Sequence, residues 1–347
     1  WGALVTDVNQ LITQYLDIWT SAIDKKSRVG RVNGGAVSLH GIKKLRELIL
    51  ELAVRGKLVR QNAEETSAIH ILENLKKSEN NPRRARKQRG QKEYEEAEPP
   101  FAVPEGWQWT PLASIADVIR GVTYKKSDAI SSERPGYVPL LRGNNIGRIL
   151  NYEGLVYVPD DLVKDDQLIQ RGDIVVAMSS GSANLVGKAS QSDDDTLKTF
   201  GAFCGVVRPI SPNLNEFFRF FFQTPFYRSA TQAAGKGIGI NNLNKSALER
   251  LWVPLPPLTE QHRIAAKVDE LMALCDVLEG QAEDSLKAHQ TLVETCLATL
   301  TNSQTPEDLS ENWSRIEAHF DTLLTTQESV ESLAKTILEL GAKGRLA

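Results

Sequence analysis

Hydrophobic positions recur with a helical period over one long stretch near the C-terminal end, residues 258–300. Its apolar residues follow one another at steps of four and three positions: Ile264, Val268, Leu271, Cys275 and Leu278. That spacing is a heptad seam and predicts a long helix whose apolar edge packs against a partner helix. A helix of about 35–40 residues here would be roughly 55 Å long, at about 1.5 Å per residue.

The spacing of hydrophobic residues changes in the middle of the chain. From Phe101 onward, short β-like runs such as YVPLLRGNNI, GDIVVAM and GAFCGVVRP are separated by turn residues, and they predict strands. Residues 215–234 return to a helical pattern, and their aromatic stripe is predicted to lie in the core. The expected fold class is α+β, with one mixed α/β domain flanked by long helices that form an antiparallel coiled-coil or helical-bundle element.

Composition places three boundaries along the chain. The stretch NPRRARKQRGQK and the following EYEEAEPP are low in apolar content and predict a flexible charged linker. WVPLPPLTEQ ends the middle domain, because its prolines remove backbone donors and forbid a helix until after Pro257. The predicted regions are an N-terminal helical region at 1–60, the linker at 61–100, the α/β domain at 101–257 and a long-helix region at 258–347.

The two ends of the chain carry nearly the same phrase. ILELAVRGKL at 49–58 returns as ILELGAKGRL at 337–346, with an offset of 288 residues. Upstream, ITQYLDIW at 12–19 lines up with IEAHFDTL at 316–323, and the first copy has a longer turn at 25–40. Amphipathic helices can resemble one another by chance, but the shared ending with its helix-stopping glycine predicts a true internal repeat.

Composition fits a globular protein of a reducing compartment. Of the 347 residues, 41% are hydrophobic and 24% are charged. Three widely spaced cysteines, Cys204, Cys275 and Cys296, argue against a disulfide framework or a zinc motif. Because no apolar run reaches the length of a membrane span and WGALVTDVNQ lacks the plan of a signal peptide, we expect a cytoplasmic protein without membrane contact.

The formal net charge of −3 is unevenly distributed. Residues 1–60 carry ten Lys and Arg against five Asp and Glu, whereas residues 258–347 carry seven against sixteen. No overall positive field exists to hold a polyanion, so DNA would meet local patches. The acidic 258–347 region indicates contact with another protein.

The sequence matches known catalytic motifs only in part or not at all. GSANLVGKA at 181–189 has five residues between its glycines where a phosphate loop has four, and Ala189 replaces the hydroxyl residue that would meet magnesium. All five histidines lie outside 101–257, and neither HExxH nor GxSxG occurs. The acids at 193–195 are weak candidates for metal ligands, since consecutive acids in a polar loop are usually solvated. We expect no catalytic residue and no metal site.

The middle domain offers polar side chains beside glycine turns, in four separate segments. Arginine pairs with guanine O6 and N7 and asparagine with adenine N6 and N7, while lysine, serine and backbone N–H groups hold phosphates. One such segment is an ordinary turn in most proteins, but four in one domain favour DNA contact. The predicted DNA-binding residues are Arg120, Thr123, Tyr124, Lys125, Lys126, Arg142, Asn144, Asn145, Ser179, Ser180, Ser182, Lys188, Lys236, Asn241 and Asn242.

Longer stretches resemble the specificity (S) subunit of type I restriction-modification enzymes. The resemblance covers almost the whole chain and rests on RELILELAVRGKLV, PEGWQWTPLASIADVIRGVTYKK, PLPPLTEQHRIAAKVDELMALCD and HFDTLLTTQESVESLAKTILELGAKGRLA. PLPPLTEQ followed directly by a heptad helix is a specific signature of the family. DIVVAMSSGS, FGAFCGVVRP and INN look like one class of its target recognition domains.

The resemblance implies a non-catalytic subunit. In that family each recognition domain reads one half of a split target in double-stranded DNA, and long helices space two such domains and dock methylation (M) subunits. Adenine-N6 methylation and DNA cleavage belong to the methylation and restriction (R) subunits, so S-adenosylmethionine, ATP and magnesium are expected only there. The repeat would be the family's pseudo-symmetry. Since only one recognition domain is seen where the family usually has two, the chain either continues or pairs as a homodimer of half-subunits.

Two other functions stay open from the residues alone. A self-sufficient DNA nuclease would use carboxylates such as Asp173 or those at 193–195, and magnesium-dependent cleavage by the purified chain would establish it. An assembly scaffold would pair its heptad helices and bind protein through the middle domain, without base readout.

Overall fold

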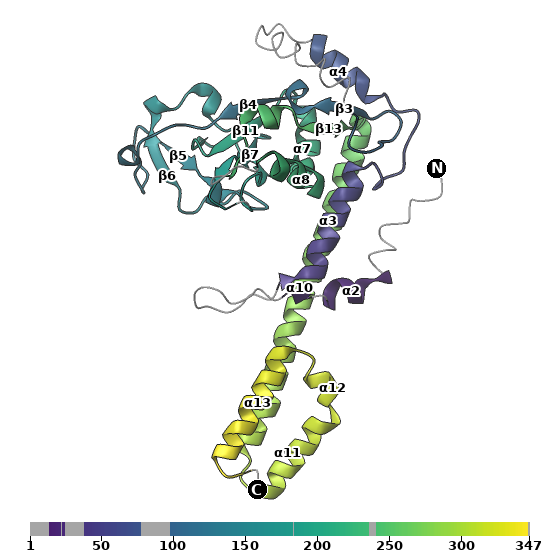
Figure 1. Ribbon diagram of the computed structural model, residues 1–347, viewed down its shortest axis with the longest axis vertical. Coiled ribbons are helices and arrows are strands. Elements are labelled where there is room, and N and C mark those ends of the chain that lie inside the picture. The colour runs from purple at the N-terminus through teal and green to yellow at the C-terminus, as the bar shows by residue number, and fades with distance from the viewer. Residues whose placement is uncertain are drawn as a thin grey trace. The chain divides into compact units, whose positions relative to one another are not determined.

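The chain divides into two compact units. The first comprises Trp1–Tyr15 and Lys43–Ala273, and the second comprises Leu16–Ile42 and Leu274–Ala347. The division falls inside helices α3 (His40–Val54) and α10 (Leu258–Asn302), whose courses Figure 1 shows. The boundaries after residues 60, 100 and 257 stay predictions. The computed structural model describes residues 14–21, 23–24, 38–77, 98–182, 184–235 and 241–345.

The first unit contains a four-stranded antiparallel sheet in the order β4-β11-β7-β9. Its strands are β4 (Ala116–Arg120), β11 (Cys204–Pro209), β7 (Ile174–Ala177) and β9 (Ala189–Gln191). All four residues of β7 are buried, as a continuous apolar run in a central strand requires. The predicted aromatic stripe forms α7 (Asn215–Phe221) and α8 (Pro225–Ala234), with Phe217, Phe218 and Phe221 fully buried. The α+β prediction is confirmed.

A second sheet in the same unit has three strands in the order β10-β5-β6. Its strands are β5 (Tyr137–Leu141), β6 (Val156–Pro159) and β10 (Thr199–Phe200), and only the β10–β5 pair is parallel. Two further pairs are antiparallel: β3 (Gln108–Pro111) with β13 (Trp252–Leu255), and β8 (Ser179–Ser180) with β12 (Asn241–Asn242). Pairing of β3 with β13 closes the domain, because it joins the domain's first strand to its last.

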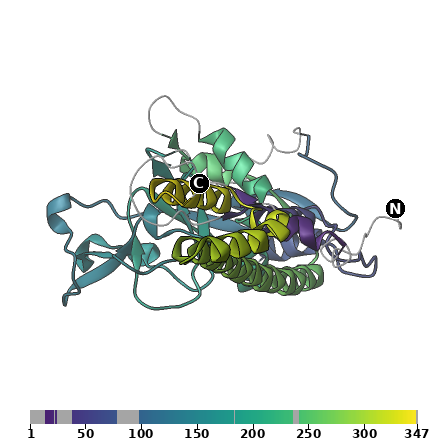
Figure 2. The same ribbon diagram turned by 90° about the horizontal axis from the view of Figure 1, so that it is seen from below.

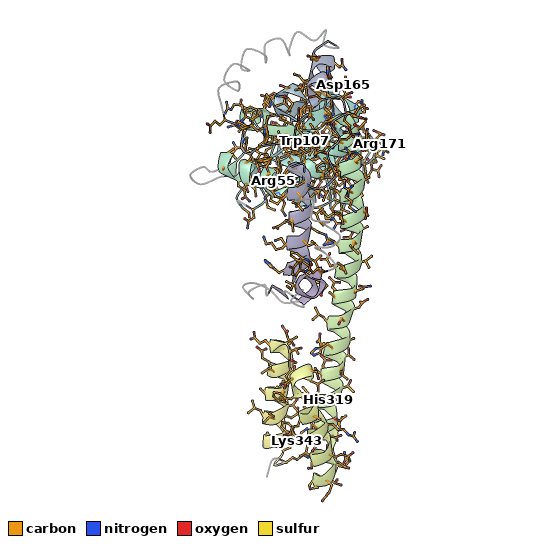
Figure 3. All side chains as sticks on the ribbon, turned by 90° about the vertical axis from the view of Figure 1, so that its right-hand side faces the viewer. Arg55, Trp107, Asp165, Arg171, His319 and Lys343 are labelled. Atoms are coloured by element: carbon orange, nitrogen blue, oxygen red, sulfur yellow. The ribbon has the colours of Figure 1, made fainter. Side chains whose placement is uncertain are left out.

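The start of α10 is tied to the segment that follows α3. Glu260 accepts hydrogen bonds from Gln61 Nε2 at 2.6 Å and from Trp107 Nε1 at 2.8 Å. Arg263 donates to the carbonyl oxygen of Arg60 at 2.8 Å and to Glu65 Oε1 at 2.7 Å. The last residues of α3 therefore lie near the first residues of α10, and within this unit the two helices run in opposite directions (Figure 3).

Helix α10 is 45 residues long, somewhat longer than expected. Gly280 does not interrupt it. All five predicted seam residues are buried, which agrees with a heptad edge turned away from water. Three of them, Ile264, Val268 and Leu271, lie in the first unit, where α3 runs beside α10 (Figures 1 and 3).

In the second unit, the rest of α10 packs with α11 (Pro306–Ala318), α12 (Phe320–Leu323) and α13 (Gln327–Ala342) (Figure 2). This unit also holds α2 (Leu16–Ser21) and the strand pair β1 (Ile23–Asp24) and β2 (Ser38–Leu39). Thr305 and Thr326 cap α11 and α13 by accepting a backbone N–H three residues on. The shared core consists of Val293, Leu297, Leu300, Ile316, Leu323, Leu333 and Leu340.

The internal repeat extends to the backbone hydrogen bonds. Helices α3 and α13 both end at a left-handed glycine, Gly56 with φ 65° and Gly344 with φ 67°. After each glycine, the next peptide N–H donates over a distance of 2.9 Å to a carbonyl five residues back: Lys57 to Leu52 and Arg345 to Leu340. This is the helix-ending motif that glycine permits, and it recurs at the offset of 288 residues.

Among the residues that the structure describes, no helix is both long enough and apolar enough to span a lipid bilayer.

Candidate DNA-reading surface

A four-residue turn, Gly201–Cys204, connects β10 to β11. It is closed by a hydrogen bond of 2.8 Å from Cys204 N to the carbonyl oxygen of Gly201. Ala202 and Phe203 form its exposed tip. The carbonyl oxygen of Phe203 accepts the peptide N–H groups of Met178 at 2.9 Å and Ser179 at 3.0 Å, so the turn is fixed to the chain that leaves β7.

Two of the predicted segments lie directly beside this turn. The segment 120–126 approaches it so closely that a Cβ on Gly121 would lie 2.1 Å from the carbonyl oxygen of Gly201. Only glycine allows that approach. On the other side, Gly201 N donates to the carbonyl oxygen of Leu141 at 2.9 Å, immediately before the segment 142–145.

The other two predicted segments are 179–182 and 236–242, and their described residues reach the turn through β8 and β12. Ser179 begins β8 and donates its N–H to Phe203. Strand β8 pairs with β12, in the register Ser179 to Asn242 and Ser180 to Asn241. The structure therefore gathers three segments and the described end of the fourth, Asn241–Asn242, around one turn, although the sequence spreads them over more than a hundred residues.

Most of the predicted DNA-binding residues on these segments have side chains in contact with water. Tyr124 is half-buried and stands against the turn, because a Cβ on Gly201 would lie 3.6 Å from its Cε1 atom. Ser179 and Ser180 are also half-buried. The exposed residues are Arg120, Thr123, Lys125, Lys126, Asn144, Ser182 and Asn242. Among the ion pairs of the described residues, none involves Arg120, Lys125 or Lys126.

Asn145 requires a correction, because it has no free surface for a base. Its side chain is fully buried, its Oδ1 accepts from Arg142 N at 2.9 Å, and its Nδ2 donates to the carbonyl oxygens of Asn151 and Glu153 at 2.9 and 3.0 Å. These bonds stabilise the loop that carries Asn144. Arg142 is half-buried and donates through Nη2 to the carbonyl oxygen of Gly154 at 3.1 Å.

Three predicted residues do not have side chains placed beside the turn. Lys188 is half-buried, and its carbonyl oxygen accepts the N–H of Ala177 at 2.9 Å. Lys236 and the side chain of Asn241 lie outside the residues that the structure describes, so their predicted roles stay predictions.

Comparison with known proteins identifies the family of this domain. Residues 104–288 match the family model of the type I restriction modification DNA specificity domain. This chain belongs to that family. Since the matched residues include the turn and all four segments, the candidate surface lies within the specificity domain.

Full-length relatives extend the match beyond the domain. The specificity subunits of the type I restriction enzymes EcoAI and EcoEI of Escherichia coli are 38% and 36% identical, each over 98% of this chain. The chain spans 58% and 57% of the length of these two relatives. The crystal structure of the HsdS subunit from Thermoanaerobacter tengcongensis aligns with 79% of this chain and 64% of that chain, at 18% identity and a TM-score of 0.42.

Three of the four carboxylates named for a nuclease, those of Asp173, Asp194 and Asp195, form ion pairs within this specificity domain. Asp173 is 1% exposed and accepts two hydrogen bonds from Arg208, at 2.9 and 2.7 Å. In the acidic loop, Lys198 Nζ lies 2.6 Å from Asp194 Oδ1 and lowers the pKa of that carboxyl. Within the described part of the chain, no three His, Cys, Asp or Glu side chains gather as metal ligands.

The Cys204 thiol at the turn is also poorly suited to act as a nucleophile. Cys204 is buried, and that burial raises its pKa to about 12, so the thiol stays protonated near neutral pH.

Sequence reasoning missed the turn itself. The run GAFCGVVRP was interpreted as a strand, and β11 begins only at Cys204. The local signal was an aromatic residue between alanine and cysteine, which is equally typical of a buried strand. Its exposure depends on the turn that Cys204 N and the carbonyl oxygen of Gly201 close between β10 and β11, which no local pattern in the sequence specifies.

Proposed function

We propose that this chain is a sequence-reading part of a type I restriction-modification specificity subunit, and that its α/β domain reads one half of a split target in double-stranded DNA. The observation that carries the proposal is the gathering of three polar segments and the described end of the fourth around the turn 201–204, inside the matched specificity domain. Arginine, asparagine and serine on neighbouring loops are the side chains that contact base edges and phosphates.

The charge pattern supports a division of roles on this surface. Arg120, Lys125 and Lys126 are exposed along one segment and are suited to phosphates. Asn144 and Asn242 are exposed on two others, and an asparagine amide can donate to N7 and accept from N6 of adenine. Positive charge is local, so we expect weak DNA binding by the chain alone and tighter binding in a complex.

Docking of methylation subunits is proposed for the second unit. Within this unit, residues 274–347 carry five basic and thirteen acidic residues, and large apolar side chains stand exposed on their helices. They include Leu292, Trp313, Phe320, Val330 and Leu338, the last 75% exposed. Exposed apolar side chains among acidic ones fit a protein partner better than a nucleic acid.

A pair of variants tests that docking. Leu338→Glu should weaken co-elution with the methylation subunit on a sizing column. Gln281→Glu, which adds the same charge at an exposed helical position without removing an apolar side chain, should not. Equal effects of the two variants would contradict the proposed apolar contact.

The proposal places all chemistry outside this chain. Adenine methylation with S-adenosylmethionine and cleavage driven by ATP and magnesium would belong to methylation and restriction subunits, as the family resemblance implies. The complex would act on DNA in the cytoplasm, as one chain with two recognition domains or as a pair of half-subunits.

The deciding experiment reconstitutes the chain with its methylation subunit and maps the methylated adenines in a random-sequence plasmid library. Residues 101–257 are then exchanged for those of a related specificity subunit. We expect a split motif of which one half changes with the exchange. A motif that the exchange leaves untouched would favour the scaffold function, and cleavage by the purified chain with magnesium would favour the nuclease.

Two adjacent asparagines refine this test within the domain. Asn144→Ala should relax discrimination at one base pair, by about 5- to 150-fold, and leave folding unchanged, because its side chain is exposed. Asn145→Ala should instead destabilise the loop, since its buried amide makes three hydrogen bonds. If both variants altered only the motif, the structural role assigned to Asn145 would be wrong.

A further inference from the structure

Phe203 is the most exposed aromatic ring of the described α/β domain, at 71%, although it lies between buried Gly201 and buried Cys204. A single apolar side chain on a surface needs no explanation by itself. Its position is the informative feature. Phe203 lies at the tip of the turn beside which three polar segments and the described end of the fourth lie, so its exposed ring is placed to contact a ligand that those segments bind.

The backbone beneath the ring is fixed from several directions. The carbonyl oxygen of Phe203 accepts two peptide N–H groups, and Cys204 N closes the turn onto Gly201. Gly201 in turn donates to Leu141 and abuts the backbone of Gly121. A side chain on such a turn loses little freedom of its backbone on binding, which is the property of a preorganised contact.

We propose that Phe203 is a specificity-determining residue whose ring makes an apolar contact with the C5-methyl group of a thymine in the major groove. This rests on the proposed function of DNA reading. The 5-methyl group of thymine is the apolar feature that base edges present in the major groove, and phenylalanine is one of the side chains that contact it. The polar segments on either side would supply hydrogen bonds to the neighbouring base edges.

The test compares thymine with uracil, which pairs identically but lacks the methyl group. Once the motif is known, duplexes carry uracil in place of each thymine of this half-site, one at a time, on either strand. Methylation by the reconstituted complex is measured as kcat/KM for the wild type, Phe203→Ala and Phe203→Leu. Leu197→Ala serves as the matched control, because Leu197 is another exposed apolar residue of the domain, at 58%.

We expect one uracil position to lower wild-type kcat/KM by about 3- to 5-fold, the effect of one buried methyl group. Phe203→Ala should show the same loss on the thymine duplex and no further loss with uracil at that position. Phe203→Leu should retain most of the discrimination, and Leu197→Ala should match the wild type. Circular dichroism should show unchanged folding of all variants, since both side chains are exposed.

Three results would overturn the inference. The first is a wild type that responds to uracil at no position. The second is a Phe203→Ala variant that loses activity equally at every thymine, or equally on unrelated sequences. The third is a discrimination between thymine and uracil that persists in Phe203→Ala. In each case a motif that still changes when residues 101–257 are exchanged would leave the proposed function standing, so the two failures are distinguishable.

Discussion

Glu260 is predicted to hold together the start of α10, the first residues of the α/β domain and the segment after α3. Its carboxylate is 1% exposed and accepts from Trp107 Nε1 at 2.8 Å and from Gln61 Nε2 at 2.6 Å. The indole N–H has little access to water, because Trp107 is itself 5% exposed. Glu260→Ala would remove its acceptor, whereas Glu260→Gln keeps an oxygen in place.

The size of the expected stability loss follows from the two hydrogen-bond donors, Trp107 Nε1 and Gln61 Nε2. A buried donor left without a partner destabilises by about 1–3 kcal/mol, whereas Gln61 is exposed enough for water to replace the lost acceptor. Removal of a buried charge offsets part of this loss. We therefore expect Glu260→Ala to lower the free energy of unfolding by about 2 kcal/mol, and Glu260→Gln to stay within about 1 kcal/mol of the wild type.

Urea unfolding followed by tryptophan fluorescence measures the difference, since the chain has six tryptophans, one of which is Trp107. With a slope of about 2–3 kcal/mol per molar urea, the midpoint of Glu260→Ala should fall by roughly 0.7–1 M. If Glu260→Gln fell as far as Glu260→Ala, the negative charge rather than the acceptor would be the stabilising feature. The role assigned to the Glu260 oxygen as a hydrogen-bond acceptor would then be wrong.

The same carboxylate gives a pH dependence with a definite sign. Burial raises the pKa of Glu260 above its usual value of 4.5, although the hydrogen bonds from Trp107 and Gln61 counteract this in part. A folded state that holds the proton more tightly than the unfolded chain loses stability as pH rises from about 4.5 through the raised pKa. Over that pH range the wild type should lose stability relative to Glu260→Gln. Urea midpoints at several pH values would measure this loss.

Three further substitutions test the packing. Gly56→Ala and Gly344→Ala both put a side chain on a left-handed residue, but only the first would place a Cβ 2.4 Å from a proline ring. Gly56→Ala should therefore lower the thermal midpoint more than Gly344→Ala, and equal losses would contradict this. Gly280→Ala should stabilise α10 by about 0.5–1 kcal/mol in urea unfolding, since nothing lies within 4 Å of the added methyl; a loss would imply unseen crowding. Arg208→Ala should destabilise by about 3–5 kcal/mol, because it leaves the buried carboxylate of Asp173 without its cation and with a hydrogen bond from Gln170 N only; a loss below 1 kcal/mol would argue against that pair.

The elements themselves could be predicted from the sequence because their signals are local. Heptad spacing over 258–300 became α10, and the run GDIVVAM became the buried strand β7. The repeated phrase at 49–58 and 337–346 became two helices that end with the same hydrogen bonds. In each case a few neighbouring residues fix the backbone, so the pattern contains the information that the fold uses.

The arrangement of the strands could not be predicted, because it depends on pairing between distant residues. The parallel pair of β10 with β5 places Phe200 opposite Leu141, and no local pattern specifies that register. For the same reason the sequence could not separate Asn144 from Asn145. Both look like turn residues suited to bases, yet only the folded loop directs one amide into three hydrogen bonds and leaves the other exposed.

The separation of support from contact explains how such a surface can vary its target. Three of the four segments begin at or just after the last residue of a strand, which is Arg120 in β4, Leu141 in β5 and Ala177 in β7. Most residues of these strands are buried or half-buried and pack in the core, whereas Lys125, Asn144 and Ser182 beyond them are exposed. Exchanging an exposed side chain there changes what the surface can bind at little expense in stability, because the buried strands keep every loop in position.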